Sequence, residues 1–337
     1  MTWIAIVLIL IPLAGYLAWN LRSVVWSRIA CWGLTVSTVL GTHLLSTQEP
    51  AGTRMLLIII ALLWSMKAVV MNEARIGKSG FRLTPFQWLA FAIGWPGMRP
   101  SLFAGVPGPA LKNTRSFIQR GCIRLTIGLV LFATAYLVWH QWALPETANN
   151  TNAQKLLTLL PSVGSAYQIV TSFLLMLAFS LSIHFGIFNI VTGCWRSVGA
   201  KCNALFVAPL HSRTLSEFWG RRWNLAFSEM TTWGVFRPLK KVVGKGPATF
   251  CAFLFSGLLH ELAISVPVQA GYGLPLIYFG LHGVAMLLES RWLSNTAWFN
   301  DHAWWPRVWT ICWIILPLPI LFHGPFLAGC LWPLVQW

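Results

Sequence analysis

The sequence predicts an all-α protein that crosses a membrane several times, and composition, hydropathy and charge placement each indicate that class. Hydrophobic residues make up 56% of the 337 positions, whereas charged residues make up only 9%. A soluble domain carries about 25% charged residues. Long apolar runs recur along the chain, and the basic residues gather between them. We therefore expect a single integral membrane domain that covers residues 1–337.

The apolar runs predict about eight transmembrane helices, because each run is close to the roughly 20 residues that a helix needs to cross a bilayer. The last two runs are the shortest. The predicted spans are Trp3–Trp19, Ile29–Leu45, Met55–Met71, Leu125–Leu144, Gln168–Asn189, Ala248–Val268, Leu274–Leu288 and Val308–Phe322.

The connections between these spans alternate between basic and charge-poor. Lys and Arg concentrate in residues 72–124 and 190–247, with smaller numbers in 20–28 and 289–307. Positive charge marks cytoplasmic loops, so we expect these four connections inside and the N-terminus outside. A bacterial inner membrane and the endoplasmic reticulum both fit. The excess of 24 Lys and Arg over 8 Asp and Glu then reflects topology and contact with membrane lipids, not a nucleic-acid partner.

Two basic connections contain stretches too apolar for plain loops. Phe81–Pro100 and Thr214–Val243 mix aromatic with basic residues, a pattern typical of interfacial or re-entrant helices. The second stretch lies in the cytoplasmic segment 190–247 and contains "FWGRRWN", which ends at Asn224. Lys67, near the end of the third span, is expected to snorkel to the interface.

An ionisable pair lies in the middle of the next predicted span, within "SGLLHE". His260 and Glu261 stand side by side there, and such residues in hydrocarbon are costly enough to indicate a functional site. Position 264 is Ile, so the second histidine of a zinc-protease motif is missing. The seven Cys are scattered without a C-x-x-C pair, so we expect neither a metal site nor a disulfide framework.

"FWGRRWN" followed by "SGLLHE" in the next span resembles the wax synthase branch of the membrane-bound O-acyltransferase family. The resemblance covers Glu217–Ser265, and the N-terminal half adds only a compatible hydropathy pattern. It implies helices around a central tunnel, with acyl transfer from acyl-CoA to a lipophilic alcohol and no cofactor beyond that co-substrate. It assigns the catalytic role to His260 and makes Asn224 its partner.

The chemistry of these two side chains suits such a reaction. An alcohol is a poor nucleophile at neutral pH, and a neutral imidazole at His260 is a suitable general base. Attack on a thioester builds negative charge on the carbonyl oxygen, which the amide of Asn224 could stabilise. Direct attack by the alcohol then needs no acyl-enzyme.

Residues near the two motifs are expected to support this site. Glu261 and Trp223 would support or orient it, although a structural role for the carboxylate is equally compatible. Arg221 and Arg222 would bind CoA phosphates, because guanidinium groups match phosphate geometry, with ordinary loop charge as the alternative. The side chains expected to line the tunnel are Trp219, Ser256 and His282.

Several alternatives remain open at this stage. The acceptor could be a terpenoid, a sterol-like alcohol or another secondary metabolite. A transporter could use His260 and Glu261 as a proton relay, and a scaffold of the same fold could lack catalysis. His184 and His282 also lie in mid-span, which suits tunnel lining or, less well, a bis-histidine haem. A homodimer is compatible with the sequence.

Overall fold

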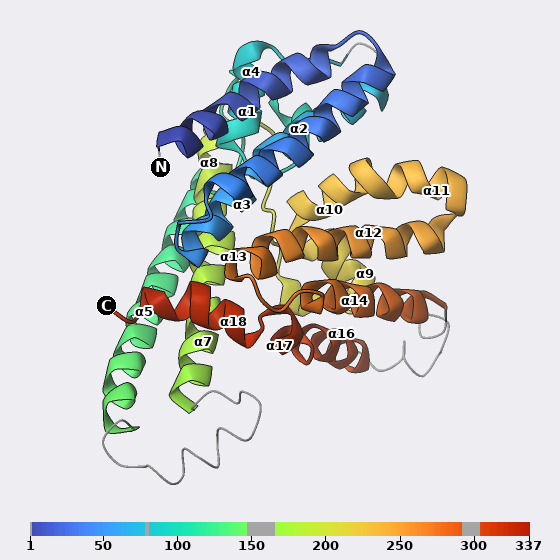
Figure 1. Cartoon of the computed structure of the whole chain (residues 1–337). Coiled ribbons are helices and arrows are strands. Elements are labelled where there is room, and N and C mark those ends of the chain that lie inside the picture. The colour runs from blue at the N-terminus through green and yellow to red at the C-terminus, as the bar shows by residue number, and fades with distance from the viewer. Residues whose placement is uncertain (1, 78–80, 147–165, 292–303) are drawn as a thin grey trace.

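The described part of the chain is built from helices, and it contains no β-strand (Figure 1). The computed structural model describes residues 2–77, 81–146, 166–291 and 304–337. The helices form three groups that follow one another in sequence, with short helices between them. This arrangement confirms the all-α class.

The first group consists of three neighbouring helices, and α3 is its centre. Val24–Leu45 and Ala51–Gly77 form α2 and α3, and both pack against α1, Thr2–Asn20. In α3, 56% of the most apolar window is buried, against 17–39% in the other long apolar helices. Helix α3 also contacts segments of the last group. It is therefore the helix on which the rest of the bundle is assembled.

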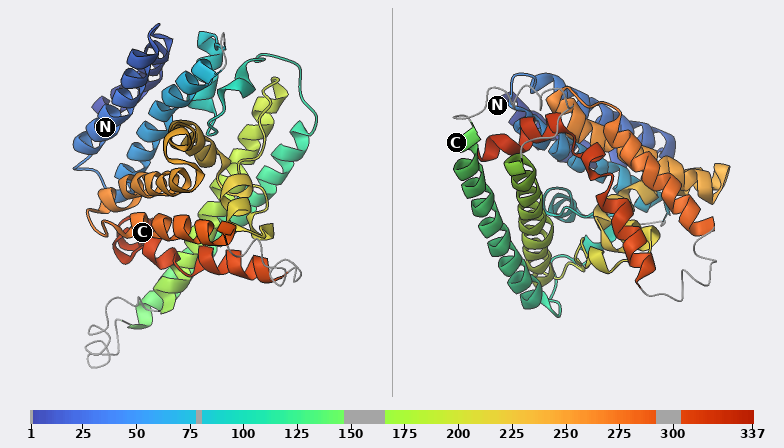
Figure 2. Two further views of the ribbon diagram at one scale, coloured as in Figure 1. Left: turned by 90° about the vertical axis from the view of Figure 1, so that its right-hand side faces the viewer. Right: turned by 90° about the horizontal axis from the view of Figure 1, so that it is seen from below.

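The second group is a pair of long helices that run side by side (Figure 2). Glycines let the two backbones approach, as is common between membrane helices. A Cβ at Gly128 of the first helix would lie 2.8 Å from the backbone oxygen of Ala178. The first helix is α5, Thr114–Glu146. The second is continuous through α7 (Ala166–Phe179), the π-helical η2 (Ser180–Ile187) and α8 (Phe188–Ser197).

The third group carries the predicted ionisable pair. Helix α12 (Lys245–His260) continues through the π-helical η6 (Glu261–Ser265) and packs along α14 (Leu274–Arg291). The chain ends in a bent run of short helices. These are α16 (Trp305–Ile315), α17 (Leu318–Leu321), α18 (Gly324–Phe326), η8 (Leu327–Leu331) and η9 (Trp332–Leu334), whereas the short α13 (Val266–Val268) directly follows η6.

The two amphipathic stretches form short helices between the groups. In the first, Thr84 and Gln87 make a capping box that starts α4 at Pro85. The indole of Trp88 then donates to the carbonyl of Pro12 and fixes α4 against α1. The helices of these stretches and their flanks are α4 (Pro85–Gly94), η1 (Pro100–Phe103), η3 (Pro209–His211), α9 (Leu215–Glu217), η4 (Phe218–Arg222), α10 (Leu225–Thr231), η5 (Thr232–Phe236) and α11 (Arg237–Val243).

Helices cover all eight predicted spans, but not all of them qualify as membrane-crossing. Within the described residues, five are long and apolar enough to cross a membrane, and a sixth qualifies if the bent pair Trp305–Leu321 and Gly324–Leu334 is one span. In the first predicted span, the apolar helix Leu8–Asn20 is too short to be counted among these membrane-crossing helices. A multi-pass membrane protein is thus confirmed, whereas the count of eight and the orientation stay predictions.

The expectation for Lys67 was wrong. Its side chain is completely buried and does not reach an interface. The ammonium group donates to the carbonyl of Trp95 at 2.6 Å and to that of Gly97, and it lies 4.1 Å from the ring centre of Phe91. The reason is local, since α4 and the loop after it cover α3 at this point and supply acceptors that water would otherwise provide.

Candidate active site

His260 ends the α-helical part of α12, and its ring is fixed by a backbone acceptor one turn earlier. The Nδ1 atom lies 2.7 Å from the carbonyl oxygen of Ser256. A carbonyl can only accept, so Nδ1 carries the proton and Nε2 keeps its lone pair. Among the described residues, Nε2 has no hydrogen-bond partner. The imidazole is therefore oriented as a base with its basic nitrogen unoccupied.

Two aromatic rings hold the imidazole from different elements. The ring centre of Phe279, on α14, lies 4.2 Å from that of His260, and that of Phe227, on α10, lies 5.3 Å away. The residue as a whole is mostly buried and keeps a small exposed fraction. Three segments far apart in sequence thus meet at this one side chain.

Asn224 has a clear structural role. Its backbone is left-handed, with φ 42° and ψ 61°, a conformation that Asn tolerates better than most residues. Its side-chain oxygen accepts from the backbone N–H of Phe227 at 3.3 Å and caps α10. The amide –NH₂ makes no hydrogen bond within the described chain. The cap therefore occupies the oxygen of Asn224 and leaves its donors available.

Phe227 connects the two predicted catalytic residues. Its N–H is capped by Asn224, and its ring contacts His260. No direct hydrogen bond between Asn224 and His260 occurs in the described structure. Asn224 and His260 are therefore connected through Phe227, and their joint catalytic role stays a prediction.

Glu261 is turned away from its neighbour in sequence and caps a helix. One carboxylate oxygen accepts from the backbone N–H of Gly273 at 2.7 Å and from that of Leu276 at 3.2 Å. These donors belong to the first turn of α14 and the residue before it, where a negative charge is stabilising. Glu261 thus fixes the start of the helix that carries Phe279.

The two motif tryptophans face different parts of the bundle. Trp219 packs edge-on against His282 at 5.3 Å and lies 5.7 Å from Phe279, so it belongs to the side of the site near α14. Trp223 packs edge-on against Phe206 at 5.0 Å and lies 5.8 Å from His184 in η2. Trp219 therefore contacts Phe279, which in turn contacts His260, whereas Trp223 connects the motif to η2 and to the segment after α8.

The remaining predicted lining residues are inside the bundle. His282 is fully buried, and its Nδ1 donates to the carbonyl of Tyr278 at 2.9 Å. The hydroxyl of Ser256 donates to the carbonyl of Ala252 at 2.9 Å, so only its backbone serves His260. A passage past these residues stays a prediction.

The two motif arginines differ in their surroundings. Arg222 forms an ion pair with Glu217 at 2.6 Å and also donates to the carbonyl of Ala208. Burial raises the pKa of Glu217, but the N–H of Arg213 and the guanidinium of Arg222 outweigh it and bring that pKa below its ordinary value. Arg221 is exposed. The structure therefore engages Arg222 internally and leaves Arg221 accessible, and CoA binding by either stays a prediction.

The haem alternative gains nothing from these surroundings. The imidazole of His184 is stacked on Phe206 at 4.4 Å, and that of His282 lies 4.3 Å from the ring of Tyr278. In the part of the chain that is described, no three His, Cys, Asp or Glu residues gather in a way that could hold a metal ion.

Sequence reasoning missed three contacts of His260, namely the backbone carbonyl of Ser256 and the rings of Phe227 and Phe279. The sequence held a signal for two of them, since Ser256 stands one helical turn before His260, and Phe227 stands three residues after a capping Asn. The third, Phe279, comes from another helix, and no pattern in the sequence points to it.

Comparison with known proteins adds evidence about this region of the chain. Residues 202–279 match the model of the membrane bound O-acyl transferase family, a range that contains Asn224, His260 and Phe279.

This segment of the chain is therefore similar to the membrane bound O-acyl transferase family.

Similar proteins come from plants. The chain is 28% identical over 148 residues to "Probable long-chain-alcohol O-fatty-acyltransferase 9" of Arabidopsis thaliana, which is 40% of this chain and 42% of that protein. It is 31% identical over 102 residues to "Long-chain-alcohol O-fatty-acyltransferase" of Simmondsia chinensis, which is 28% of this chain and 29% of that one. The match therefore spans less than half the length of these plant relatives.

Proposed function

We propose that this chain is an acyl-CoA-dependent O-acyltransferase that esterifies a lipophilic alcohol. The observation that carries the proposal is the state of His260, whose Nδ1–H is held by a carbonyl while Nε2 is left without a partner. The family match covers the same residues. A long-chain alcohol is the first acceptor to test, because the similar plant proteins are named for that substrate.

The proposed reaction proceeds by direct attack. Nε2 of His260 accepts the hydroxyl proton as the alcohol oxygen bonds to the thioester carbonyl carbon. The negative charge that develops on the carbonyl oxygen is met by the amide donors of Asn224. The carbon–sulfur bond then breaks, the ester is released, and the CoA thiolate takes the proton from the imidazolium. No group on the enzyme is acylated.

The surroundings of His260 support this role over a proton relay. A relay would pass protons between His260 and Glu261, but the carboxylate is directed to the backbone of α14. Arg221 is the better candidate for a CoA phosphate, because Arg222 is already paired. A terpenoid, sterol-like or secondary-metabolite hydroxyl would be acylated by the same chemistry.

The test uses purified protein, labelled acyl-CoA and a panel of long-chain alcohols, terpenoid alcohols and sterols, with the neutral ester measured. His260→Ala should abolish ester formation. His211→Ala is the matched control, because His211 is exposed in η3 and makes no side-chain hydrogen bond in the described structure. If His260→Ala retains wild-type turnover, the base assignment is refuted. If the wild-type protein forms no ester with any acceptor, the function itself is refuted.

A further inference from the structure

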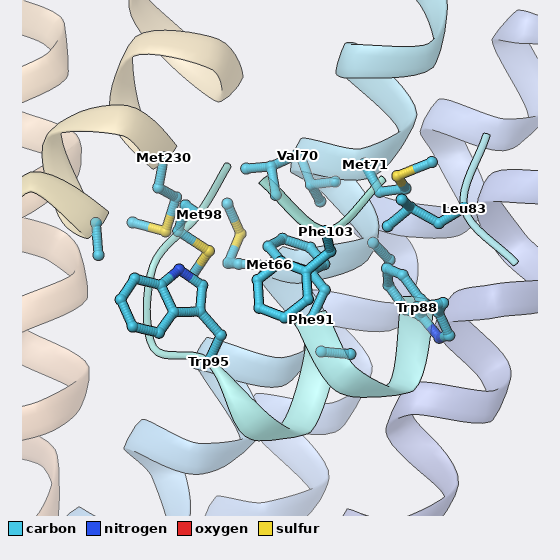
Figure 3. Close-up of a cluster of buried hydrophobic side chains, with 14 of the residues drawn as sticks. Met66, Val70, Met71, Leu83, Trp88, Phe91, Trp95, Met98, Phe103 and Met230 are labelled. Atoms are coloured by element: carbon cyan, nitrogen blue, oxygen red, sulfur yellow. The ribbon is translucent and has the colours of Figure 1, made fainter. Parts of the chain in front are cut away.

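Lys67 lies outside the site but forms part of a polar network that reaches toward it. The ammonium is buried in a cluster of apolar side chains, and its acceptors are the backbone carbonyls of Trp95 and Gly97. Figure 3 shows this cluster, where Trp95 and Met98 lie beside Met230 of α10. A buried ammonium without acceptors would be very unfavourable, so these contacts fix the loop after α4 in one position.

The same loop forms an ion pair with α10. A terminal nitrogen of Arg99 lies 2.6 Å from a carboxylate oxygen of Glu229, and the Glu229 side chain is 21% exposed. Burial raises the pKa of Glu229, while the charge and hydrogen bond of Arg99 act in the opposite direction. The loop that Lys67 holds is thereby connected to the helix that carries Phe227.

The ion pair meets α10 close to the residues that contact His260. Helix α10 (Leu225–Thr231) is the first part of a continuous helical run that passes through η5 into α11 and ends at Val243. Its first turn is fixed by the Asn224 cap and presents Phe227 to His260. Its second half carries Glu229 and the buried Met230.

We propose that Lys67, Arg99 and Glu229 act together as positioning residues that hold α10, and so hold Asn224 and Phe227 beside His260. In its catalytic part this inference rests on the proposed function. None of the three residues contacts His260 directly, so their effect passes through the placement of α10. Since a displacement of about 1 Å can cost about 100-fold in rate, a loosened α10 should lower turnover.

The experiment breaks the ion pair and leaves the Lys67 side chain in place. Arg99→Gln and Glu229→Gln remove the charges, and Arg99→Lys keeps one. The matched control is Arg28→Gln, which breaks a pair with Glu73 at 2.7 Å whose side chains are 47% and 14% exposed, close to the 55% and 21% of Arg99 and Glu229. The readouts are kcat, KM for acyl-CoA, and hydrogen–deuterium exchange of the amides in residues 225–231.

We expect both Gln variants to lower kcat about tenfold or more with KM little changed, and to speed amide exchange in α10. Arg99→Lys should recover part of the loss, and Arg28→Gln should change neither readout. Unchanged exchange in α10 would refute the positioning role, whatever reaction the protein catalyses. Faster exchange with unchanged kcat, in a protein that His260→Ala inactivates, would refute its catalytic part and leave the proposed function standing.

Discussion

Replacement of Glu261 should separate the structural part of the His–Glu pair from its catalytic part. One carboxylate oxygen accepts two backbone N–H groups at the start of α14, at 2.7 Å and 3.2 Å. Glu261→Ala removes both bonds and the negative charge at the helix N-terminus. Glu261→Gln keeps an acceptor oxygen of similar reach and removes only the charge.

The expected cost follows from these contacts. Loss of a helix-capping side chain costs about 0.5–2 kcal/mol, and bonds to a charged group lie toward the upper end, so we expect about 2 kcal/mol for Glu261→Ala. For a chain of 337 residues this corresponds to a fall in Tm of about 3 °C. Glu261→Gln should lose about 0.3–1 kcal/mol, the usual contribution of a charge at a helix end.

The assay combines thermal unfolding in detergent with ester formation per folded molecule. Leu258→Ala is the control, because Leu258 is 51% exposed on the same helix. Glu261→Gln should keep most of the wild-type kcat. Glu261→Ala should lower the Tm more clearly than it lowers ester formation per folded molecule. A Glu261→Gln protein with wild-type Tm and no turnover would refute this reasoning, since the carboxylate would then have to act in the reaction itself.

Three further predictions test other parts of the structure. Gly128→Ala should destabilise the protein in a thermal melt, because the new Cβ would lie 2.8 Å from backbone atoms of the neighbouring helix, whereas Gly33→Ala, with nothing within 4 Å, should be neutral or slightly stabilising. Asn224→Asp should keep the α10 cap and the unfolding temperature but lower kcat about 100- to 1,000-fold, because the amide donors are lost; unchanged kcat would exclude them from the reaction. Because the pKa of Glu217 is held below its ordinary value of 4.5, its contribution to stability is complete above that pH and is lost as pH falls through the lowered pKa. Glu217→Gln should therefore make Tm less sensitive to acid, and an unchanged acid profile would contradict the ion pair with Arg222.

Much of the fold could be predicted from local patterns. Apolar runs located the long helices because a membrane-crossing helix must satisfy its backbone internally and cover itself with apolar side chains. The mixed aromatic and basic stretches indicated short helices between the groups. The same reasoning failed at Lys67, because it treated the side chain as free to reach water and could not foresee that α4 would cover it.

The sequence by itself determined the class of the protein, the family motifs and the two residues on which the proposed chemistry depends. These are local properties, since hydropathy and motif spacing are carried by neighbouring positions. Only the tertiary structure decided that Glu261 serves α14, that Phe279 packs against His260, and that a buried lysine is connected through a loop to α10. Each of those contacts joins segments distant in sequence, and which partners meet depends on how the helices pack and on where buried polar groups find acceptors.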